Sequence, residues 1–325
     1  MRNPLNIDWK KEMDNFIMEY VALGFDCGSN ADEYFLFFRE KYNLHKDHDP
    51  FIQITTYKEF LEILQNTYPD EYKEIHKGTP FFWIGWYSFL VEYYDQAVFY
   101  IDAAMSEDKI KHPPEVWPDS GAAMFFRLKL TNYQLFFRSS TAPELEEILK
   151  QEFKRFNLLN LNNNLTIENF VENFVGKIIY DDNTAIITTL YTFILEKDRI
   201  MEMIHNRGKY GGTIEPMITH IFKGALIFET LLKIHYAGTM LGNTINQCKA
   251  KYTFDFNQCT PNSFNEIFNY TNQNNKQTAF CITYKLRNKT AHKLNWNDSF
   301  TESNYENIYQ NILNAIFFVI QEEYL

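Results

Sequence analysis

Residues 303–319 read Ser-Asn-Tyr-Glu-Asn-Ile-Tyr-Gln-Asn-Ile-Leu-Asn-Ala-Ile-Phe-Phe-Val and carry the clearest structural pattern in the chain. Apolar side chains recur every three or four positions, which predicts an amphipathic helix with one buried face. That face comprises Tyr305, Ile308, Ile312, Ala315, Ile316 and Val319. Ser303 and Glu306 have the spacing of a capping box, so we expect the helix to begin at Ser303. A helix with such a stripe needs other helices to cover it.

The same period runs through most of the second half of the chain. Residues 182–205 are expected to form one helix, and the glycines of 208–212 to end it. A further helix is predicted from Thr213 to about Ala237. An asparagine-rich loop at 269–275 then leads into another helix. Four or five antiparallel helices joined by short loops form a bundle.

A cluster of asparagines predicts the domain boundary. Residues 157–164 read Asn-Leu-Leu-Asn-Leu-Asn-Asn-Asn, which is poor in helix formers and rich in a turn-forming residue. A chain of 325 residues is long enough for two domains of ordinary size. We therefore expect domains over 1–160 and 161–325, with Thr166 as the N-cap of the first helix after the boundary.

The first half also has helical periodicity. Helices are expected over 9–23, 32–42 and 57–66, and others are expected to open at Thr79-Pro80 and at Thr141. Five residues have the spacing of one tetratricopeptide repeat: Ile84, Gly85, Ala97, Ile101 and Ala104. No second copy follows, so the pattern favours a single helical hairpin over a solenoid. The predicted fold class is all-α, with an N-terminal helical domain that contains this hairpin and a C-terminal bundle.

Composition limits the possible partners. The chain carries a formal net charge of -11 and has only 12 Gly and 10 Pro. Its acidity argues against a broad, non-specific nucleic-acid surface. The sequence has no run of about 18 uncharged apolar residues that would cross a membrane, and its first residues lack the apolar core of a signal peptide. The expectation is a soluble, cytoplasmic protein.

The cysteines do not suggest a metal site. Four are present, and they have neither CxxC spacing nor paired histidines at metal-ligand distance. We expect them to be small buried residues in a reducing compartment, and we expect no metal and no cofactor. These four residues are Cys27, Cys248, Cys259 and Cys281.

One short stretch reverses the acidic balance of the chain. Residues 284–293 read Tyr-Lys-Leu-Arg-Asn-Lys-Thr-Ala-His-Lys and contain no acid. Arginine offers a fixed fork of donors for phosphate oxygens, and histidine exchanges a proton near neutral pH. Similar Arg-to-His spacings occur at Arg39 to His45 and at Arg199 to His205, but acids flank those arginines and no amide follows them. Composition, rather than spacing alone, therefore distinguishes 284–293.

Arg287, Asn288 and His292 resemble the signature of the HEPN superfamily (higher eukaryotes and prokaryotes nucleotide-binding). In that family an arginine, a polar residue and a histidine lie late in a helical bundle, with one more helix behind them. The resemblance covers about the last half of this chain. It implies a metal-independent endoribonuclease that works as a homodimer with paired motifs in one cleft. It also implies an antiphage or toxin role, and it leaves any antitoxin or other regulator unspecified.

The predicted chemistry follows from these residue types. His292 would take the proton of a 2'-hydroxyl or give one to the departing 5'-oxygen. Arg287 would stabilise charge on the phosphoryl oxygens, and Asn288 would orient His292 or the phosphate. The products would be a 2',3'-cyclic phosphate and a 5'-hydroxyl. Lys285, Lys289 and Lys293 would guide the RNA backbone.

Helix geometry favours two copies of the motif over one. Arg287 and His292 are five residues apart, which is about 140° on an ideal helical wheel. A single copy therefore does not close both groups tightly around one atom. Symmetry across a dimer axis would bring the arginine of one chain to the histidine of the other.

Simpler interpretations stay open beside these. Arg287 would be a surface ion-pair partner, Asn288 a satisfied polar residue, and His292 a half-buried histidine. Glu229 lies in an apolar run, so it would either pair with Arg287 and position it or share a polar face with Lys223 and Lys233. His220 and His235 have the pattern of ordinary helix-face residues. The alternative function is a non-catalytic module that binds a nucleotide, an RNA or a protein.

Overall fold

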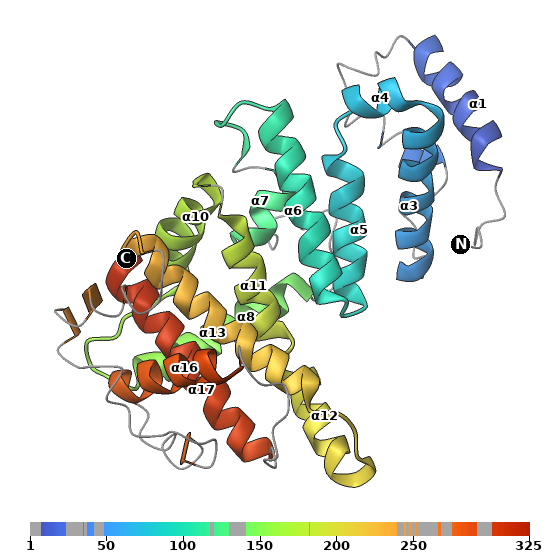
Figure 1. Ribbon diagram of the computed structural model, residues 1–325. Coiled ribbons are helices and arrows are strands. Elements are labelled where there is room, and N and C mark those ends of the chain that lie inside the picture. The colour runs from blue at the N-terminus through green and yellow to red at the C-terminus, as the bar shows by residue number, and fades with distance from the viewer. Residues whose placement is uncertain are drawn as a thin grey trace. The chain divides into compact units, whose positions relative to one another are not determined.

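The protein is all-α, as predicted. The computed structural model describes residues 8–23, 35, 38–41, 49–117, 120–129, 141–181, 183–238, 244, 247–248, 251–252, 266–267, 275–290 and 301–325. These residues form helices and include no strand (Figure 1). They belong to two compact units, Met1–Ala142 and Pro143–Leu325.

The first unit is built from short and medium helices. They are α1 (Trp9–Ala22), α3 (Pro50–Thr67), α4 (Pro69–Glu74), α5 (Gly78–Leu90), α6 (Tyr94–Lys111) and α7 (Gly121–Phe126). The helix expected over 57–66 is longer, because Asp49 caps it by accepting a hydrogen bond from the backbone N–H of Phe51 at 2.8 Å. Of the helix expected over 32–42, the structure describes residues 35 and 38–41, which are helical.

Helices α5 and α6 pack as a helical hairpin. A Cβ atom on Gly85 would lie 2.6 Å from Cγ1 of Ile101 and 2.8 Å from the carbonyl oxygen of Ala97. The two backbones therefore approach at a distance that only glycine permits. The hairpin matches the arrangement expected from the spacing of these residues, while its likeness to a tetratricopeptide repeat stays a prediction.

The second unit is built around α17. Its elements are α8 (Thr141–Asn157), α9 (Ile167–Asn169), η3 (Phe170–Val175), α10 (Gly176–Tyr180), α11 (Thr184–Leu195), α12 (Lys197–Tyr210), α13 (Glu215–His235), α16 (Lys276–Thr290), α17 (Glu302–Val319) and the π-helical turn η6 (Ile320–Tyr324). Helix α17 contacts α13 and α16 (Figure 1). Phe317 of α17 packs edge-to-face on Phe153 and Phe156 of α8, with ring centroids 5.0 and 5.6 Å apart. The apolar stripe of 303–319 thus forms the core that its period predicted.

The single helix expected over 182–205 is wrong, because the chain turns at Glu196 between α11 and α12. The buried carboxylate of Glu196 pairs with Lys223 of α13 at 2.8 Å and with Arg199 at 2.9 Å. One turn earlier, the hydroxyl of Thr192 donates to backbone carbonyls of its own helix, which is a contact that bends helices. Helical periodicity on both sides of the turn concealed it.

The asparagine-rich segment 157–164 lies inside the second unit. The side chain of Asn157 donates to the carbonyl oxygen of Leu165 at 2.8 Å, and that of Asn163 donates to the carbonyl oxygen of Phe156 at 2.9 Å. The backbone N–H of Asn164 donates to Gln321 at 3.0 Å. The segment is therefore a hydrogen-bonded turn. After it, Thr166 caps α9 as predicted by accepting from the N–H of Asn169 at 3.2 Å.

The start of α17 differs from the prediction by two residues. Thr301, rather than Ser303, is the N-cap, and its hydroxyl accepts from the N–H of Asn304 at 3.2 Å. Ser303 lies within the first turn. Thr301 occupies an extended backbone conformation, which an N-cap residue requires.

A matched pair of variants tests this assignment. Thr301→Ala is expected to lower the free energy of unfolding by about 1 kcal/mol, because one backbone N–H of the first turn loses its acceptor. Ser303→Ala is expected to change it by less than about 0.5 kcal/mol. Urea unfolding followed by circular dichroism measures both values. A larger loss for Ser303→Ala than for Thr301→Ala would contradict the observed cap.

Two further expectations concern the cysteines and the membrane. Cys248 is buried and free, whereas Cys281 is buried and disulfide-bonded. The prediction of reduced cysteines is therefore wrong for Cys281, and the cysteines give no support to a reducing compartment. Of the helices described, none has both the length and the apolar character needed to cross a membrane.

Candidate functional site

The structure describes four of the predicted site residues on one helix end. Lys285, Arg287, Asn288 and Lys289 lie in the last two turns of α16, and each is partly exposed. The predicted residues His292 and Lys293 lie outside the described residues. The described part of the site therefore consists of an arginine, an amide and two lysines.

Arg287 is held from α13 by Glu229. Nε of Arg287 donates to one carboxylate oxygen, and Nη2 donates to the other at 3.0 Å. Two parallel bonds of this kind fix the plane of the guanidinium as well as its position. The pairing of Glu229 with Arg287 that the sequence suggested is therefore present. Among the described residues, the third nitrogen, Nη1, has no hydrogen-bond acceptor, and the Arg287 side chain is 28% exposed.

Glu229 also pairs with a second cation. Nζ of Lys233, one turn later on α13, lies 2.5 Å from the same carboxylate. Burial of Glu229 raises the pKa of its carboxyl group, but the hydrogen bonds and charges of Arg287 and Lys233 outweigh this and hold the pKa below its ordinary value. Glu229 is thus ionised at neutral pH, and the three side chains together keep one net positive charge.

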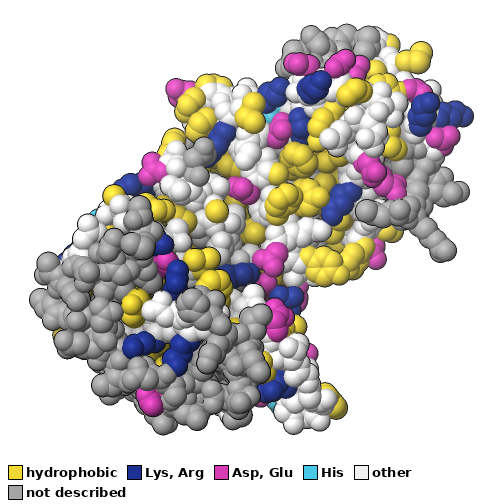
Figure 2. All heavy atoms as spheres, in the orientation of Figure 1, with side chains coloured by type: hydrophobic (Ala, Val, Ile, Leu, Met, Phe, Trp, Pro, Cys, Tyr) yellow, Lys and Arg dark blue, Asp and Glu magenta, His cyan; other side chains and the backbone are white. Residues whose placement is uncertain are grey.

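The positive charge at this helix end is local. Lys285 and Lys289 add two cations to the same two turns of α16. On the face of the molecule drawn in Figure 2, by contrast, the basic and acidic side chains of the described residues are interspersed.

The pKa of Glu229 gives a prediction for stability. Because the folded-state pKa is lowered, the ion pair contributes stability at pH values above the ordinary pKa of glutamate, about 4.3, and this contribution is lost as pH falls through the folded-state pKa. We expect Glu229→Gln to cost about 1–3 kcal/mol at pH 7 and clearly less at pH 3. Urea unfolding at both pH values measures this. Glu202→Gln, at an exposed position of α12, is the control and is expected to change little at either pH; a cost for Glu229→Gln that grows at pH 3 would contradict the assignment.

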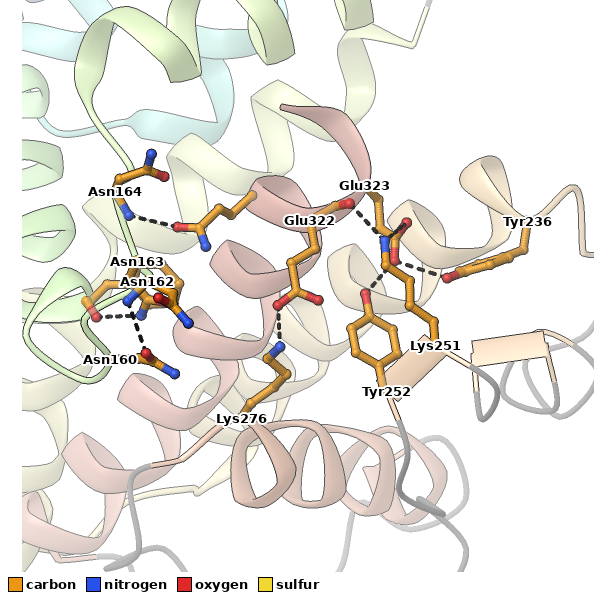
Figure 3. Close-up of polar contacts among 12 residues, drawn as sticks. Asn160, Asn162, Asn163, Asn164, Tyr236, Lys251, Tyr252, Lys276, Glu322 and Glu323 are labelled. Carbon is orange, nitrogen blue, oxygen red and sulfur yellow. Dashed lines mark hydrogen bonds and ion pairs between the residues drawn. The ribbon is translucent and has the colours of Figure 1, made fainter.

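A second polar cluster, centred on Glu323, was not predicted. Its buried carboxylate accepts hydrogen bonds from the hydroxyl groups of Tyr236, at 2.9 Å, and Tyr252 (Figure 3). Lys251 and His235 pair with it at 2.8 and 2.9 Å. Four donors from two segments, residues 235–236 and 251–252, therefore meet on one side chain of the π-helical turn η6.

The Glu323 cluster has a structural role, because it connects residues 235–236 and 251–252 to η6. Burial raises the pKa of the Glu323 carboxyl group, but hydrogen bonds from Lys251, Tyr252 and Tyr236 outweigh it and lower the pKa. Nearby, burial raises the pKa of the Cys248 thiol to about 12, which makes that thiol a poor nucleophile at neutral pH. The four contacts satisfy the Glu323 carboxylate, which would otherwise be costly to bury. No sequence pattern predicts this cluster, because Glu323 is more than 70 residues away in the chain from the residues that it contacts.

His220 is not an ordinary helix-face residue. Its ring is buried between Phe193 and Tyr305, with Nε2 2.8 Å from the carbonyl oxygen of Phe193 and Nδ1 2.7 Å from the hydroxyl of Tyr305. Both ring nitrogens are thus used within the core. His220 connects α11, α13 and α17 and is not placed to meet a substrate.

In the described part of the first unit, His76, Asp108 and His112 bring their ligand atoms within 4.8 Å of one another. This is a donor set that could hold a metal ion, which the sequence did not predict. The sequence signal that was present is the four-residue interval from Asp108 to His112, a spacing that puts two side chains on one face of a helix. In the structure α6 ends at Lys111, and His112 is its C-cap residue. His76 is distant in sequence and is brought there by the fold.

Fold and site together define an all-α protein of two compact units, with a cationic helix end in the second. Comparison of the chain with protein-family models, with curated proteins and with solved structures gives no match.

Proposed function

We propose that the second unit is a metal-independent endoribonuclease of the HEPN type. The observation that carries the proposal is the fixed guanidinium of Arg287, which is held by Glu229 on one edge and remains partly exposed on the other. An arginine held in this way is preorganised to receive a phosphate, because little conformational freedom is lost on binding. The adjoining Lys285 and Lys289 supply charge for the flanking phosphates.

The bonding changes in the proposed reaction are those of a transesterification. The 2'-oxygen of a ribose attacks the adjacent phosphorus, the bond from phosphorus to the 5'-oxygen breaks, and a 2',3'-cyclic phosphate and a 5'-hydroxyl result. His292 moves one of the two protons, from the 2'-hydroxyl or to the 5'-oxygen. Arg287 stabilises the charge that develops on the non-bridging oxygens, and Asn288 orients the phosphate or the imidazole.

The proposal needs no metal ion at the cationic helix end. Both carboxylate oxygens of Glu229 are engaged by Arg287, and one of them also by Lys233, so Glu229 is not available as a metal ligand. Charge stabilisation falls to the guanidinium instead. The reaction is therefore expected to proceed in EDTA.

We include a homodimer in the proposal. The five-residue separation of Arg287 and His292 places them on different sides of an ideal helix, and a second copy would complete the arrangement around one phosphate. Such a dimer would present two guanidinium groups and two imidazoles in one cleft.

The experiment is an RNA cleavage assay in EDTA with two matched oligonucleotides. One is all-ribose, and the other carries a single 2'-deoxyribose at the preferred cleavage position. We expect cleavage of the first only, with a 2',3'-cyclic phosphate end that mass spectrometry identifies. Binding of both oligonucleotides without cleavage would contradict the endoribonuclease and favour a non-catalytic RNA-binding module. Cleavage of both would exclude attack by the 2'-hydroxyl.

A further inference from the structure

A compact cluster in the first unit is formed by His76, Asp108 and His112. The cationic helix end belongs to the second unit. Nε2 of His76 lies 2.9 Å from Oδ1 of Asp108. The rings of His76 and His112 pack edge-to-face with centroids 4.8 Å apart. His76 and Asp108 are buried, with side chains 7% and 10% exposed, whereas His112 is exposed. Two ligands are thus shielded, and the third opens the cluster to solvent.

The scaffold around the cluster holds the three side chains from two directions. Asp108 lies in the last turn of α6, and His112 follows directly, with its N–H bonded to the carbonyl oxygen of Asp108 at 2.9 Å. His76 lies in the connection between α4 and α5. Lys77 pairs with Glu107 at 3.2 Å and so fastens this connection to α6 beside the cluster.

Two further side chains fix the same connection and the end of α6. Nζ of Lys111 donates to the carbonyl oxygens of Lys73 and Glu74, at 3.3 and 3.2 Å. Nε1 of Trp117 donates to the carbonyl oxygen of His112 at 2.8 Å. The backbone on both sides is therefore tied by contacts that do not use the three ligand atoms. A binding site gains affinity when its ligands are held in this way before the ion arrives.

Gly78 leaves space next to the ligand atoms. A Cβ atom at this position would lie 2.8 Å from Nε2 of His76 and 3.0 Å from Oδ1 of Asp108. Gly78 is helical and has no positive φ, so its backbone conformation does not demand glycine. The absence of a side chain instead keeps open the space beside the two buried ligand atoms.

We propose that His76, Asp108 and His112 bind one divalent transition-metal cation of the Zn²⁺ class. Two imidazoles and one carboxylate are a common donor set for such ions, and three protein ligands leave room for water. Metal–ligand distances of about 2.0–2.2 Å at tetrahedral angles place neighbouring ligand atoms about 3.4 Å apart. The His76–Asp108 distance of 2.9 Å lies within about 0.5 Å of this value, and rotation of the exposed His112 side chain would bring in the third ligand atom, since all three atoms already lie within 4.8 Å of one another.

Binding would tie the α4–α5 connection to the end of α6. The hydrogen bond between His76 and Asp108 would be replaced by two bonds to the cation, and His112 would join them. The site would therefore stabilise the first unit, and its readout is metal content and thermal stability rather than RNA cleavage. Neither outcome depends on the function proposed for the second unit.

The test measures Zn²⁺ binding to the full chain by equilibrium dialysis after EDTA treatment, with metal content determined by mass spectrometry. We expect one equivalent in the wild type and about 100-fold weaker binding in His112→Ala and Asp108→Asn. His205→Ala is the matched control, because His205 is also exposed and pairs with a carboxylate, that of Glu302, but has no third ligand among the described residues. This control is expected to bind as the wild type does.

A second measurement separates loss of binding from loss of folding. Zn²⁺ at about 100 times its Kd is expected to raise the Tm of the wild type by about 5–10 °C and that of His112→Ala by much less. In EDTA the two proteins are expected to unfold at the same temperature, since the His112 side chain is exposed. Equal affinity and equal Tm shifts in the wild type and His112→Ala, or no saturable binding in the wild type, would overturn the proposal.

Discussion

Replacement of His292 by alanine is expected to slow RNA cleavage by about a hundred- to ten-thousand-fold, because proton transfer by a positioned side chain contributes this much to such reactions. RNA binding is expected to change little, since Arg287, Lys285 and Lys289 retain their charges. Rates are measured in EDTA with the all-ribose oligonucleotide, and affinity by fluorescence anisotropy. The proposed role of His292 in proton transfer predicts this separation of rate from affinity.

The chain offers a close control for this substitution. His205 follows Arg199 at nearly the same interval as His292 follows Arg287, but it pairs with Glu302 on the surface of the second unit. His205→Ala is expected to cleave at the wild-type rate. Arg287→Lys tests the other half of the motif: it retains the charge but loses the two-pronged contact with Glu229, so it is expected to be slower than wild type. Equal rates in wild type and His292→Ala would remove His292 from the mechanism.

Phe317→Ala is expected to lower the free energy of unfolding of the second unit by about 3–5 kcal/mol. Its ring is fully buried and packs edge-to-face on Phe153 and Phe156, so its removal leaves a cavity where α8 meets α17. Rigid helices on both sides limit how far that cavity collapses.

Urea unfolding measures this loss as a lower midpoint at an unchanged slope. Leu161→Ala is the control, because Leu161 lies in the same unit and is fully exposed, and it is expected to change stability by less than about 0.5 kcal/mol. A loss below about 1 kcal/mol for Phe317→Ala would mean that α8 does not depend on this contact.

The parts of the fold that sequence predicted are those that local periodicity controls. The buried stripe of α17, the start after Thr166 and the length of α13 all follow from spacing and capping within one segment. The turn at Glu196 did not follow, because its main partner, Lys223, lies on another helix. The cap of α17 was displaced because Thr301 and Ser303 have similar capping chemistry, and backbone conformation chose between them.

The candidate sites also divide into those that neighbouring residues make predictable and those that depend on contacts between distant segments. The cationic helix end was visible because Arg287 and its lysines are neighbours in sequence, and the pairing with Glu229 was suggested by one carboxylate in an apolar run. The Glu323 cluster and the group around His76 were not visible. Glu323 and His76 are each separated by tens of residues from their partners, and packing alone brings them together.

The sharing of Glu229 between two cations has a consequence for how an incoming anion would be received. If Arg287 turned toward a phosphate, Lys233 would stay beside the carboxylate, so the protein would not be left with a bare buried anion. Any weakening of the Arg287–Glu229 pair would therefore carry a smaller electrostatic cost than the rupture of an isolated pair. Helix α13 thus carries both the carboxylate that binds Arg287 of α16 and the second cation, Lys233, that neutralises this carboxylate.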